Sequence, residues 1–239
     1  MAEVPEWQWD ERVQVGTDYQ DPAEVAAYDA RMGRFRDVQA ENRAILEALA
    51  LTPEQILLEF GTGTGSFAIA AAGVCAAVYA CDVSPMMLAY AREKAQRAGA
   101  SNITFLLGGF LTYTHPGPAV DAVVTQLALH HLPDFWKGVA LGRIAGLLKP
   151  GGKLYLRDVV FSFPAADHAS RFDAVLADYT EPMRTNFVRH LAREHSTSDW
   201  IMEGLLTRAG FCLESCDYQG GVFARYLCRK RKRGECEGA

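Results

Sequence analysis

The sequence lacks three features that would assign the protein to a specialised class. None of its six cysteines forms a C-x-x-C pair, so the chain shows neither metal-binding nor disulfide spacing. No stretch approaches the ~20 apolar residues of a membrane span, and no positively charged segment followed by an apolar run opens the chain. Positive charge is not in excess, because the net charge is −5. We therefore expect a soluble, cytoplasmic protein with buried, reduced thiols and no bound metal.

The low positive charge also bears on the partners of the protein. With a pI of about 5.7, the chain has no broad basic face to follow a phosphate backbone, so we expect no nucleic-acid partner. One basic run, 229–233, lies near the C-terminus, where the simplest interpretation is a solvated tail. The 239 residues, 49% of them hydrophobic, suffice for one α/β core. Composition does not distinguish a monomer from a homodimer.

A glycine-rich turn is the most informative feature that the sequence does contain. The apolar run 56–60 predicts a buried strand, 68–73 predicts a small-residue helix, and Gly61, Gly63 and Gly65 alternate between them. Because glycine has no side chain, a ligand can approach the backbone of such a turn closely. The turn therefore predicts a cofactor site.

Two cofactor classes compete for this turn. A dinucleotide fingerprint, G-x-G-x-x-G/A, fails from Gly61, because its sixth position is Ser66. The fingerprint fits from Gly63, but the strand would then extend to Thr62 and leave Glu59 inside it. Read from Glu59, the order acid-x-Gly-x-Gly-x-Gly places a carboxylate where a cationic, nucleoside-like ligand can reach it. We favour this second interpretation.

A second acid follows the next predicted strand. Asp82 ends the apolar run 76–81, and the segment from Ser84 onward predicts the start of a helix. An acid about 20 residues beyond a glycine turn is placed to receive ribose hydroxyls. Asp82 or Ser84 can equally cap the helix, and the two roles are compatible.

These segments, taken in order, resemble the class I S-adenosylmethionine-dependent methyltransferases, in their small-molecule, ubiquinone/menaquinone-methyltransferase-like branch. The resemblance covers about residues 41–230 and includes the Asp-x-Ser-Pro block at 82–85, the His-His-Leu run at 130–132 and the Lys-Pro-Gly-Gly turn at 149–152, expected as a break before a strand over 154–160. It implies an α/β, doubly wound, seven-stranded and mostly parallel sheet in the order 3-2-1-4-5-7-6, with the last strand antiparallel and helices on both faces.

The resemblance also implies a cofactor, S-adenosyl-L-methionine, and a set of residues around it. Asp82 receives the ribose, Val83 lies against the adenine and Gln126 lies over the methionine moiety. The family usually carries an acid for the adenine amino group where this chain has Gly108, Gly109 and Phe110. Phe110 is expected either to stack on adenine beside a backbone hydrogen bond or to be an ordinary core residue. The full expected set is Tyr28, Glu59, Gly61, Gly63, Gly65, Asp82, Val83, Gly109, Phe110 and Gln126.

Two irregular segments flank this regular core. Residues 1–40 are rich in aromatic side chains and predict an N-terminal lid, although packing on the flank of the sheet is the equal alternative. Residues 161–196 add helical segments beyond what a crossover needs, and they predict a substrate cap within a methyltransferase domain over 41–239. Tyr179, Arg189, His190 and His195 in this insertion are candidates to touch the substrate.

The chemistry expected of such a protein is methyl transfer to a small-molecule acceptor. His130, His131 and Asp158 are the candidate catalytic residues, and a base is optional because a sulfonium methyl is already electrophilic. No Asn-Pro-Pro-Tyr run follows 121–125 and no Pro-Cys pair occurs, which disfavours amine methylation on nucleobases and cytosine C5 methylation. Two alternatives stay open, a nicotinamide-dependent oxidoreductase and a catalytically silent cofactor-binding protein.

Overall fold

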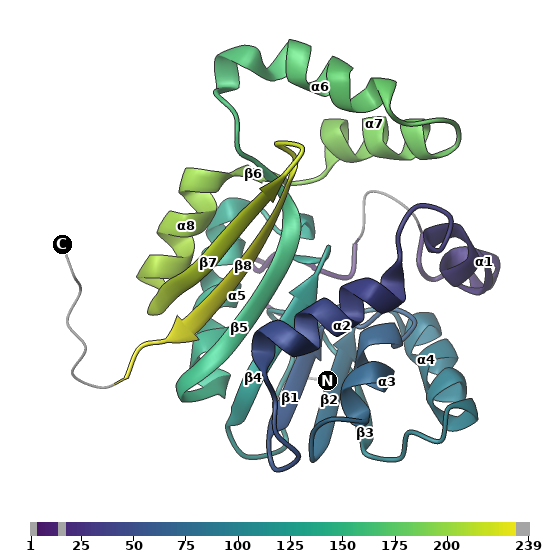
Figure 1. Ribbon diagram of the computed structural model, residues 1–239, viewed down its shortest axis with the longest axis vertical. Helices are drawn as coiled ribbons and strands as arrows, with labels where there is room; N and C mark the ends of the chain where they lie inside the picture. Colours follow the sequence, from purple (N-terminus) through teal and green to yellow (C-terminus); the bar gives the residue numbers. More distant parts are fainter. Residues whose placement is uncertain (1–3, 14–17, 233–239) are drawn as a thin grey trace.

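A single twisted sheet with helices on both faces forms the protein (Figure 1). The computed structural model describes residues 4–13 and 18–232. The main sheet has the strand order β3-β2-β1-β4-β5-β8-β7, and the short β6 pairs with β5 outside this path. Strands β1 to β5 run parallel, whereas β8 is antiparallel to both of its neighbours. The predicted sheet order and the single antiparallel strand are confirmed, with the numbering shifted by β6.

The elements alternate along the chain as a doubly wound fold requires. The strands are β1 Ile56–Phe60, β2 Ala77–Asp82, β3 Ile103–Leu107, β4 Val120–Gln126, β5 Leu148–Phe161, β6 Thr197–Ser198, β7 Phe211–Gln219 and β8 Phe223–Lys230. The helices are α1 Pro22–Met32, α2 Val38–Leu49, α3 Ser66–Ala72, α4 Pro85–Arg97, α5 Asp134–Leu147, α6 His168–Ala177, α7 Met183–Arg193 and α8 Asp199–Arg208, with 3-10 turns η1 Leu129–His131 and η2 Ala165–Asp167.

Two apolar layers cover the two faces of the sheet. Because side chains alternate along a strand, neighbouring residues of β1 enter different layers: Leu58 joins the layer under α5 and α8, and Leu57 joins the layer under α2 and α3. Both residues are fully buried. The central strands, buried on both faces, therefore fix the carboxyl ends of β1, β2 and β4 in one rigid edge.

The strand order reverses between β1 and β4, which lie side by side while their connections leave in opposite directions. In open α/β sheets, ligands bind in the crevice at such a switch point, beyond the carboxyl ends of the strands. Helices α6 and α7, from the insertion, stand above this same end of the sheet (Figure 1). The fold therefore brings the glycine turn and the insertion to one edge.

The expected break at 149–152 is wrong in one respect. Strand β5 already begins at Leu148, which pairs with Val120, and the next pairs of this ladder join Ala122 to Lys153. Residues 149–152 bulge out of the ladder between these pairs, and Gly151 takes a φ of +81° there. After the insertion, Thr197 and Ser198 form β6, and helix α8 begins directly after them at Asp199.

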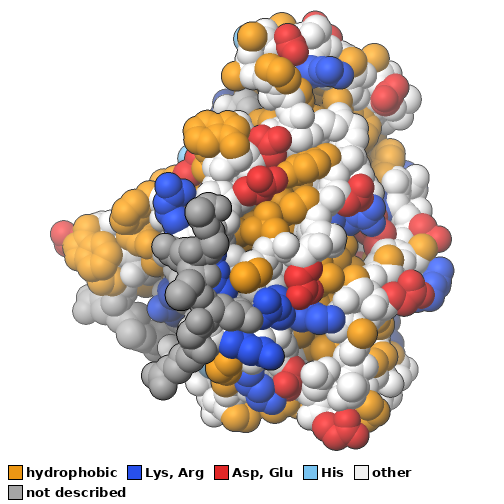
Figure 2. Space-filling view, turned by 60° about the vertical axis from the view of Figure 1, so that its left-hand side comes forward, with side chains coloured by type: hydrophobic (Ala, Val, Ile, Leu, Met, Phe, Trp, Pro, Cys, Tyr) orange, Lys and Arg blue, Asp and Glu red, His pale blue; other side chains and the backbone are white. Residues whose placement is uncertain are grey.

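Two expectations about surface residues also need correction. Arg229 and Lys230 belong to β8 rather than to a solvated tail, and the Lys230 Nζ donates to the Leu148 carbonyl at 2.6 Å. Figure 2 shows basic side chains gathered on this face of the molecule. Cys216 is exposed and Cys212 half-buried, so of the five cysteines in the described residues only Cys75, Cys81 and Cys228 meet the expectation of buried thiols; Cys236 lies outside the described residues. Within 4–13 and 18–232, no helix is long and apolar enough to cross a membrane.

Candidate functional site

The glycine turn joins β1 to α3 and is fastened to β2 next to it. The Gly61 amide donates to the Cys81 carbonyl at 2.9 Å, and the Gly63 amide donates to the Asp82 carboxylate at 2.8 Å. Gly61 has a φ of +69°, and a Cβ there would lie 2.6 Å from the Ala128 Cβ. A Cβ on Gly63 would meet no atom within 4 Å, so this residue faces open space. The turn therefore leaves bare backbone at the edge of a cleft.

Two buried carboxylates, Glu59 and Asp82, stand at the tips of β1 and β2. Burial raises the pKa of Glu59 to about 8, and the hydroxyl of Thr62, 2.7 Å from its Oε2, opposes this shift. Burial also raises the pKa of Asp82, although the amides of Ser84 and Gly63 donate to its two oxygens. A cationic ligand, or one with hydroxyl donors, would offset the desolvation of both groups.

Ser84 caps α4, as one of the two interpretations of this block predicted. Its hydroxyl accepts from the Met87 amide at 3.1 Å and lies 2.6 Å from the Tyr19 carbonyl, to which it donates. Since Ser84 takes the capping role, the Asp82 carboxylate can face the pocket, whose wall it joins. The two roles therefore fall on two residues.

A small pocket of about 90 Å³ lies beyond Asp82. Val83, Gly109 and Phe110 line it, and Glu11, Tyr19 and Tyr28 from the N-terminal part of the chain close it. Phe110 stacks on Phe60, with ring centroids 5.1 Å apart. The pocket is smaller than the roughly 300 Å³ of ordinary ligand sites.

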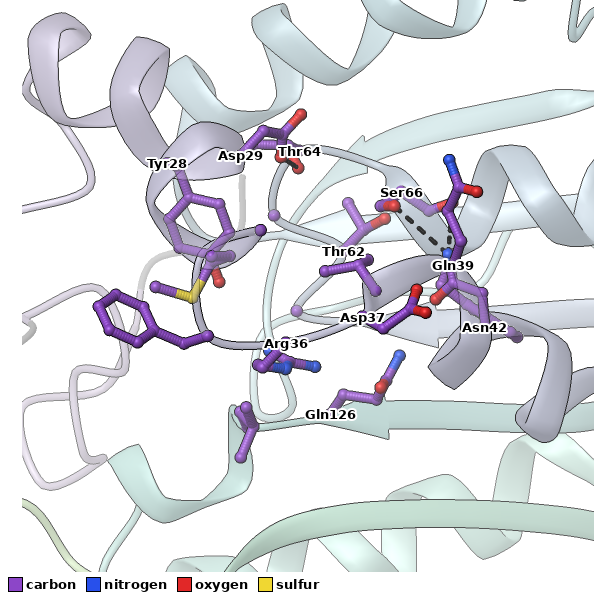
Figure 3. Close-up of a pocket in the computed structure, with 18 of the residues that line it drawn as sticks. Tyr28, Asp29, Arg36, Asp37, Gln39, Asn42, Thr62, Thr64, Ser66 and Gln126 are labelled. Carbon is purple, nitrogen blue, oxygen red and sulfur yellow. Dashed lines mark hydrogen bonds between the residues drawn. The ribbon is translucent and has the colours of Figure 1, made fainter. Parts of the chain in front are cut away.

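An open cleft of about 750 Å³ continues on the other side of the turn, lined by Glu59, Gly61, Gly63 and Gln126. The buried Gln126 Oε1 has no hydrogen-bond partner among residues 4–13 and 18–232. Tyr28 of α1 also faces this cleft (Figure 3). An unpartnered acceptor in a ligand-sized cleft indicates that a donor group of a ligand belongs there. Of the expected cofactor residues, only Gly65 lines neither cavity; it is the N-cap of α3.

A third cavity, of about 420 Å³, is lined by side chains of α7 and of the segments on either side of this helix. It shares Tyr28 and Leu127 with both of the other spaces. Leu127 holds a φ of +51°, a conformation that a leucine adopts only when its surroundings impose it. The three spaces therefore meet at one strained residue directly after β4. Aromatic and charged side chains make up much of the remaining wall: Tyr19, Phe35, Tyr179, Phe187, Phe223, Arg31, Arg36, Arg157, Arg189, Glu41, Glu194, His130, His131 and His190.

The candidate catalytic residues form a network at the floor of this third cavity. The Nδ1 of His130 lies 2.5 Å from the Asp158 Oδ1, and its Nε2 lies 3.0 Å from the Glu194 Oε2. Burial opposes protonation of His130, but the two carboxylates outweigh it and raise the pKa to about 9. Burial and the charge of His130 lower the pKa of His131 to about 3. At neutral pH His130 is therefore charged and His131 is neutral.

The residues of this network differ in whether they line the cavity. His131 lines both the small pocket and the third cavity, whereas Asp158 lines neither and is 1% exposed. Both Asp158 oxygens accept hydrogen bonds, from the His130 amide and ring and from the Val159 amide. Of the insertion candidates, Tyr179, Arg189 and His190 line the third cavity, while His195 packs edge-on against Trp9 instead.

Atoms able to ligate a metal also converge in this network. Within the described part of the chain, one such set is formed by His130, His190 and Glu194, whose ligand atoms lie within 4.8 Å of one another. Each ring nitrogen of the two histidines is already close to an oxygen partner, Asp158 and Glu194 for His130, Glu194 and Ser196 for His190. Hydrogen bonds within the cluster therefore account for its geometry without a metal ion. The absence of a bound metal stays a prediction.

Similarities to known proteins decide the class of this site. Residues 57–152 match the family described as a methyltransferase domain. An uncharacterized methyltransferase of Geobacillus kaustophilus is 30% identical over 187 residues, which cover 78% of this chain and 81% of that protein. The chain belongs to the S-adenosylmethionine-dependent methyltransferases. The nicotinamide and silent-binding alternatives receive no support from these similarities.

Solved structures of other methyltransferases have a similar fold to this chain. Magnesium protoporphyrin IX methyltransferase from Synechocystis PCC 6803 with bound S-adenosylmethionine is similar with a TM-score of 0.64 and 19% identity, covering 95% of this chain and all of that one. A putative methyltransferase from Bacillus halodurans is similar with a TM-score of 0.65 and 17% identity, covering 81% of this chain and all of that one. The cofactor of the methyltransferase is S-adenosylmethionine, and the unpartnered Gln126 Oε1 and the paired carboxylates of Glu59 and Asp82 suit it.

Two residues of this region escaped the sequence prediction, Glu11 and Glu194. Both carry a carboxylate into a cavity from a segment far away in the sequence, Glu11 into the small pocket and Glu194 into the third cavity. Glu194 carries no motif of its own. For Glu11 one signal existed, because the absence of an acid at 108–110 left a position for another residue to fill.

Proposed function

We propose that the methyltransferase transfers a methyl group to a small aromatic acceptor, of the quinone-like kind used by the ubiquinone/menaquinone branch. The observation that carries this proposal is the third cavity, which adjoins the cleft of the glycine turn, since Tyr28 and Leu127 line both spaces. Its volume of about 420 Å³ lies within the 300–1,000 Å³ typical of small-molecule sites. A polymer substrate would need an open groove rather than a pocket under a cap.

The lining of the cavity favours a flat ring with an anionic or hydroxyl substituent. Phe187 stacks almost parallel to His190, with an interplanar angle of 2°, and packs against Tyr179 and Phe223. Four arginines and two glutamates line the cavity, which gives its wall an excess of positive charge. The arginine fork donates to carboxylate or phenolate oxygens, and aromatic walls bind rings, so both features select the same chemical class.

Each expected cofactor residue receives a role in this proposal. The backbone of Gly61 and Gly63 lets the cofactor approach, with Gly65 ending the turn; Asp82 receives the ribose hydroxyls; Val83, Gly109 and Phe110 surround the adenine. Glu59 and Gln126 hold the methionine moiety, and Tyr28 lies near the sulfonium because it faces all three spaces.

Methyl transfer then depends mainly on alignment. S-adenosylmethionine, when bound, supplies a methyl group on a positively charged sulfur. The chain holds the acceptor oxygen, nitrogen or carbon in line with that group and excludes water, and positioning of this kind lowers barriers by ~7 to 11 kcal/mol in the best intramolecular cases. The acceptor donates the electron pair of the new bond, the bond between the methyl group and the sulfur breaks with its electrons left on the sulfur, which gives S-adenosylhomocysteine, and any proton on the acceptor passes to solvent.

His131 is the candidate catalytic residue that reaches the acceptor. With a pKa of about 3, it takes up a proton poorly at neutral pH, so we assign it to orienting the acceptor rather than to acting as a base. His130 and Asp158 act as positioning residues, because their ion pair fixes the segment that carries His131. The segment 1–40 serves as a lid and 161–196 as the substrate cap, since side chains from both line the third cavity.

Activity on a panel of acceptors tests the proposal. With methyl-labelled S-adenosylmethionine, we expect transfer to hydroxylated or carboxylated aromatic compounds. Phe187→Ala should raise the KM for such an acceptor about tenfold or more, because it removes a ring from the cavity wall. Phe135→Ala is the matched control, since Phe135 is 72% exposed and lies outside the cavity. Transfer only to a protein or a nucleic acid, or equal effects of the two variants, would contradict the proposal.

A further inference from the structure

The adenine end of the cofactor site lacks an acid on the loop after β3, and the N-terminal part of the chain brings one there. Glu11 is only 5% exposed and lines the small pocket together with Asp82, Val83 and Gly109. A Cβ built on Gly109 would lie 2.4 Å from both the Cδ and the Oε2 of Glu11. The Glu11 carboxylate therefore occupies the space that an acidic side chain at position 109 would fill.

The two oxygens of this carboxylate accept different numbers of hydrogen bonds. Oε1 accepts from the Leu111 amide at 3.1 Å, the Thr112 amide at 2.9 Å and the Thr112 hydroxyl at 2.7 Å. Oε2 accepts only from the Leu111 amide, at 3.0 Å, a donor that it shares with Oε1. A carboxylate oxygen has two lone pairs, so Oε2 retains acceptor capacity on the wall of the pocket.

We propose that Glu11 is the carboxylate that recognises the adenine amino group of the cofactor. Oε1 anchors the N-terminal segment to the loop after β3, and Oε2 accepts a hydrogen bond from the exocyclic amine. Residue 109 is a glycine because its side chain would collide with the Glu11 carboxylate and with the Val83 Cγ1, 2.7 Å away. The N-terminal segment is thereby part of the cofactor site and not only a cover for the acceptor.

A cofactor analogue whose base lacks the amino group distinguishes recognition of adenine by Glu11 from anchoring of the N-terminal segment by the same residue. S-inosylhomocysteine, the deaminated counterpart of S-adenosylhomocysteine, presents a keto oxygen where adenine presents a donor. Facing a carboxylate, this oxygen is repelled, so the wild-type protein should bind S-adenosylhomocysteine at least about 30-fold more tightly. Binding is measured by calorimetry, without turnover. The inference rests on the cofactor assignment, which the wild-type affinity for S-adenosylhomocysteine tests separately.

Glu11→Gln is the decisive variant. Its carbonyl oxygen can keep the three donors of Oε1, while its amide group replaces Oε2 with a donor. We expect S-adenosylhomocysteine to bind about 10-fold or more weakly and S-inosylhomocysteine to bind as well as before or better, so the preference shrinks or inverts. Glu6→Gln, an exposed glutamate of the same segment, should leave the preference unchanged.

Two outcomes would overturn the proposal. In one, Glu11→Gln weakens both ligands by the same factor, which is the result expected of an anchor alone. In the other, the wild-type protein binds the two ligands equally well. A lower melting temperature of the variant affects both ligands alike, so the ratio of the two dissociation constants stays informative as long as either ligand binds.

Discussion

Replacing Asp82 by asparagine tests the ribose site with the least change of shape. The Asp82 carboxylate accepts from the Gly63 and Ser84 amides, one on each oxygen. Asparagine can satisfy only one of these amides, since its second polar atom is itself a donor. It also replaces charge-assisted bonds to ribose hydroxyls, each worth about 1.5–3 kcal/mol, by weaker ones.

We expect Asp82→Asn to lose about 3 kcal/mol of binding free energy for S-adenosylhomocysteine, a factor of roughly 150 in the dissociation constant. Asp121→Asn is the matched control. Asp121 also accepts from a backbone amide, that of Ile56 at 2.9 Å, but it lies at the start of β4, the opposite end of the strand from the site. Isothermal titration calorimetry measures both variants, with a thermal melt of each to show that it is folded. An affinity of Asp82→Asn within threefold of the wild type would refute the ribose assignment.

Three further predictions concern stability. Burial raises the pKa of Glu59 to about 8, so the stability that this group contributes is fully present below its unfolded pKa near 4.3 and is lost as the pH rises through 8. Urea unfolding of the ligand-free protein between pH 5 and 8.5 should show the free energy of unfolding fall over this range. Glu59→Gln should remove about 4 kcal/mol of that fall. A decline unchanged in that variant would argue against a protonated Glu59. Gly61→Ala should destabilise the free protein more than Gly63→Ala, because only the first Cβ collides, at 2.6 Å from the Ala128 Cβ; equal melting temperatures would contradict this packing. Lys137→Met should lower the melting temperature by roughly 4–8 °C, since it removes a buried ammonium that donates to Asp134 and to the His195 carbonyl; an unchanged melt would show that these bonds contribute nothing.

The sheet could be predicted from the sequence because its central strands are buried on both faces. Apolar runs such as 56–60 and 76–81 predict strands locally, and the acids at their ends, Glu59 and Asp82, mark the edge where a ligand binds. The glycine turn was predictable for the same reason, since it lies directly between a strand and a helix, and Gly61 and Gly63 both take a positive φ there. Features that depend on residues close together in the sequence could therefore be predicted from it.

Features that depend on contacts between residues far apart in the sequence could not be predicted from it. Glu11 reaches Leu111 from 100 residues away, and nothing in the sequence around Glu11 indicates that contact. The same holds for the charge state of the histidine pair. The sequence shows two adjacent histidines, but only the approach of Asp158 and Glu194 to His130 sends their pKa values in opposite directions. Basic residues 229 and 230 looked like a tail because their pairing partners lie in β5 and β7.

A crystal structure of the protein with S-adenosylhomocysteine tests the central claim most directly. The account predicts that the ribose lies on Asp82, the adenine between Val83 and Phe110 with its amino group on Glu11, and the sulfur beside Tyr28. Density for the nucleoside anywhere other than the carboxyl edge of β1 and β2 would contradict it.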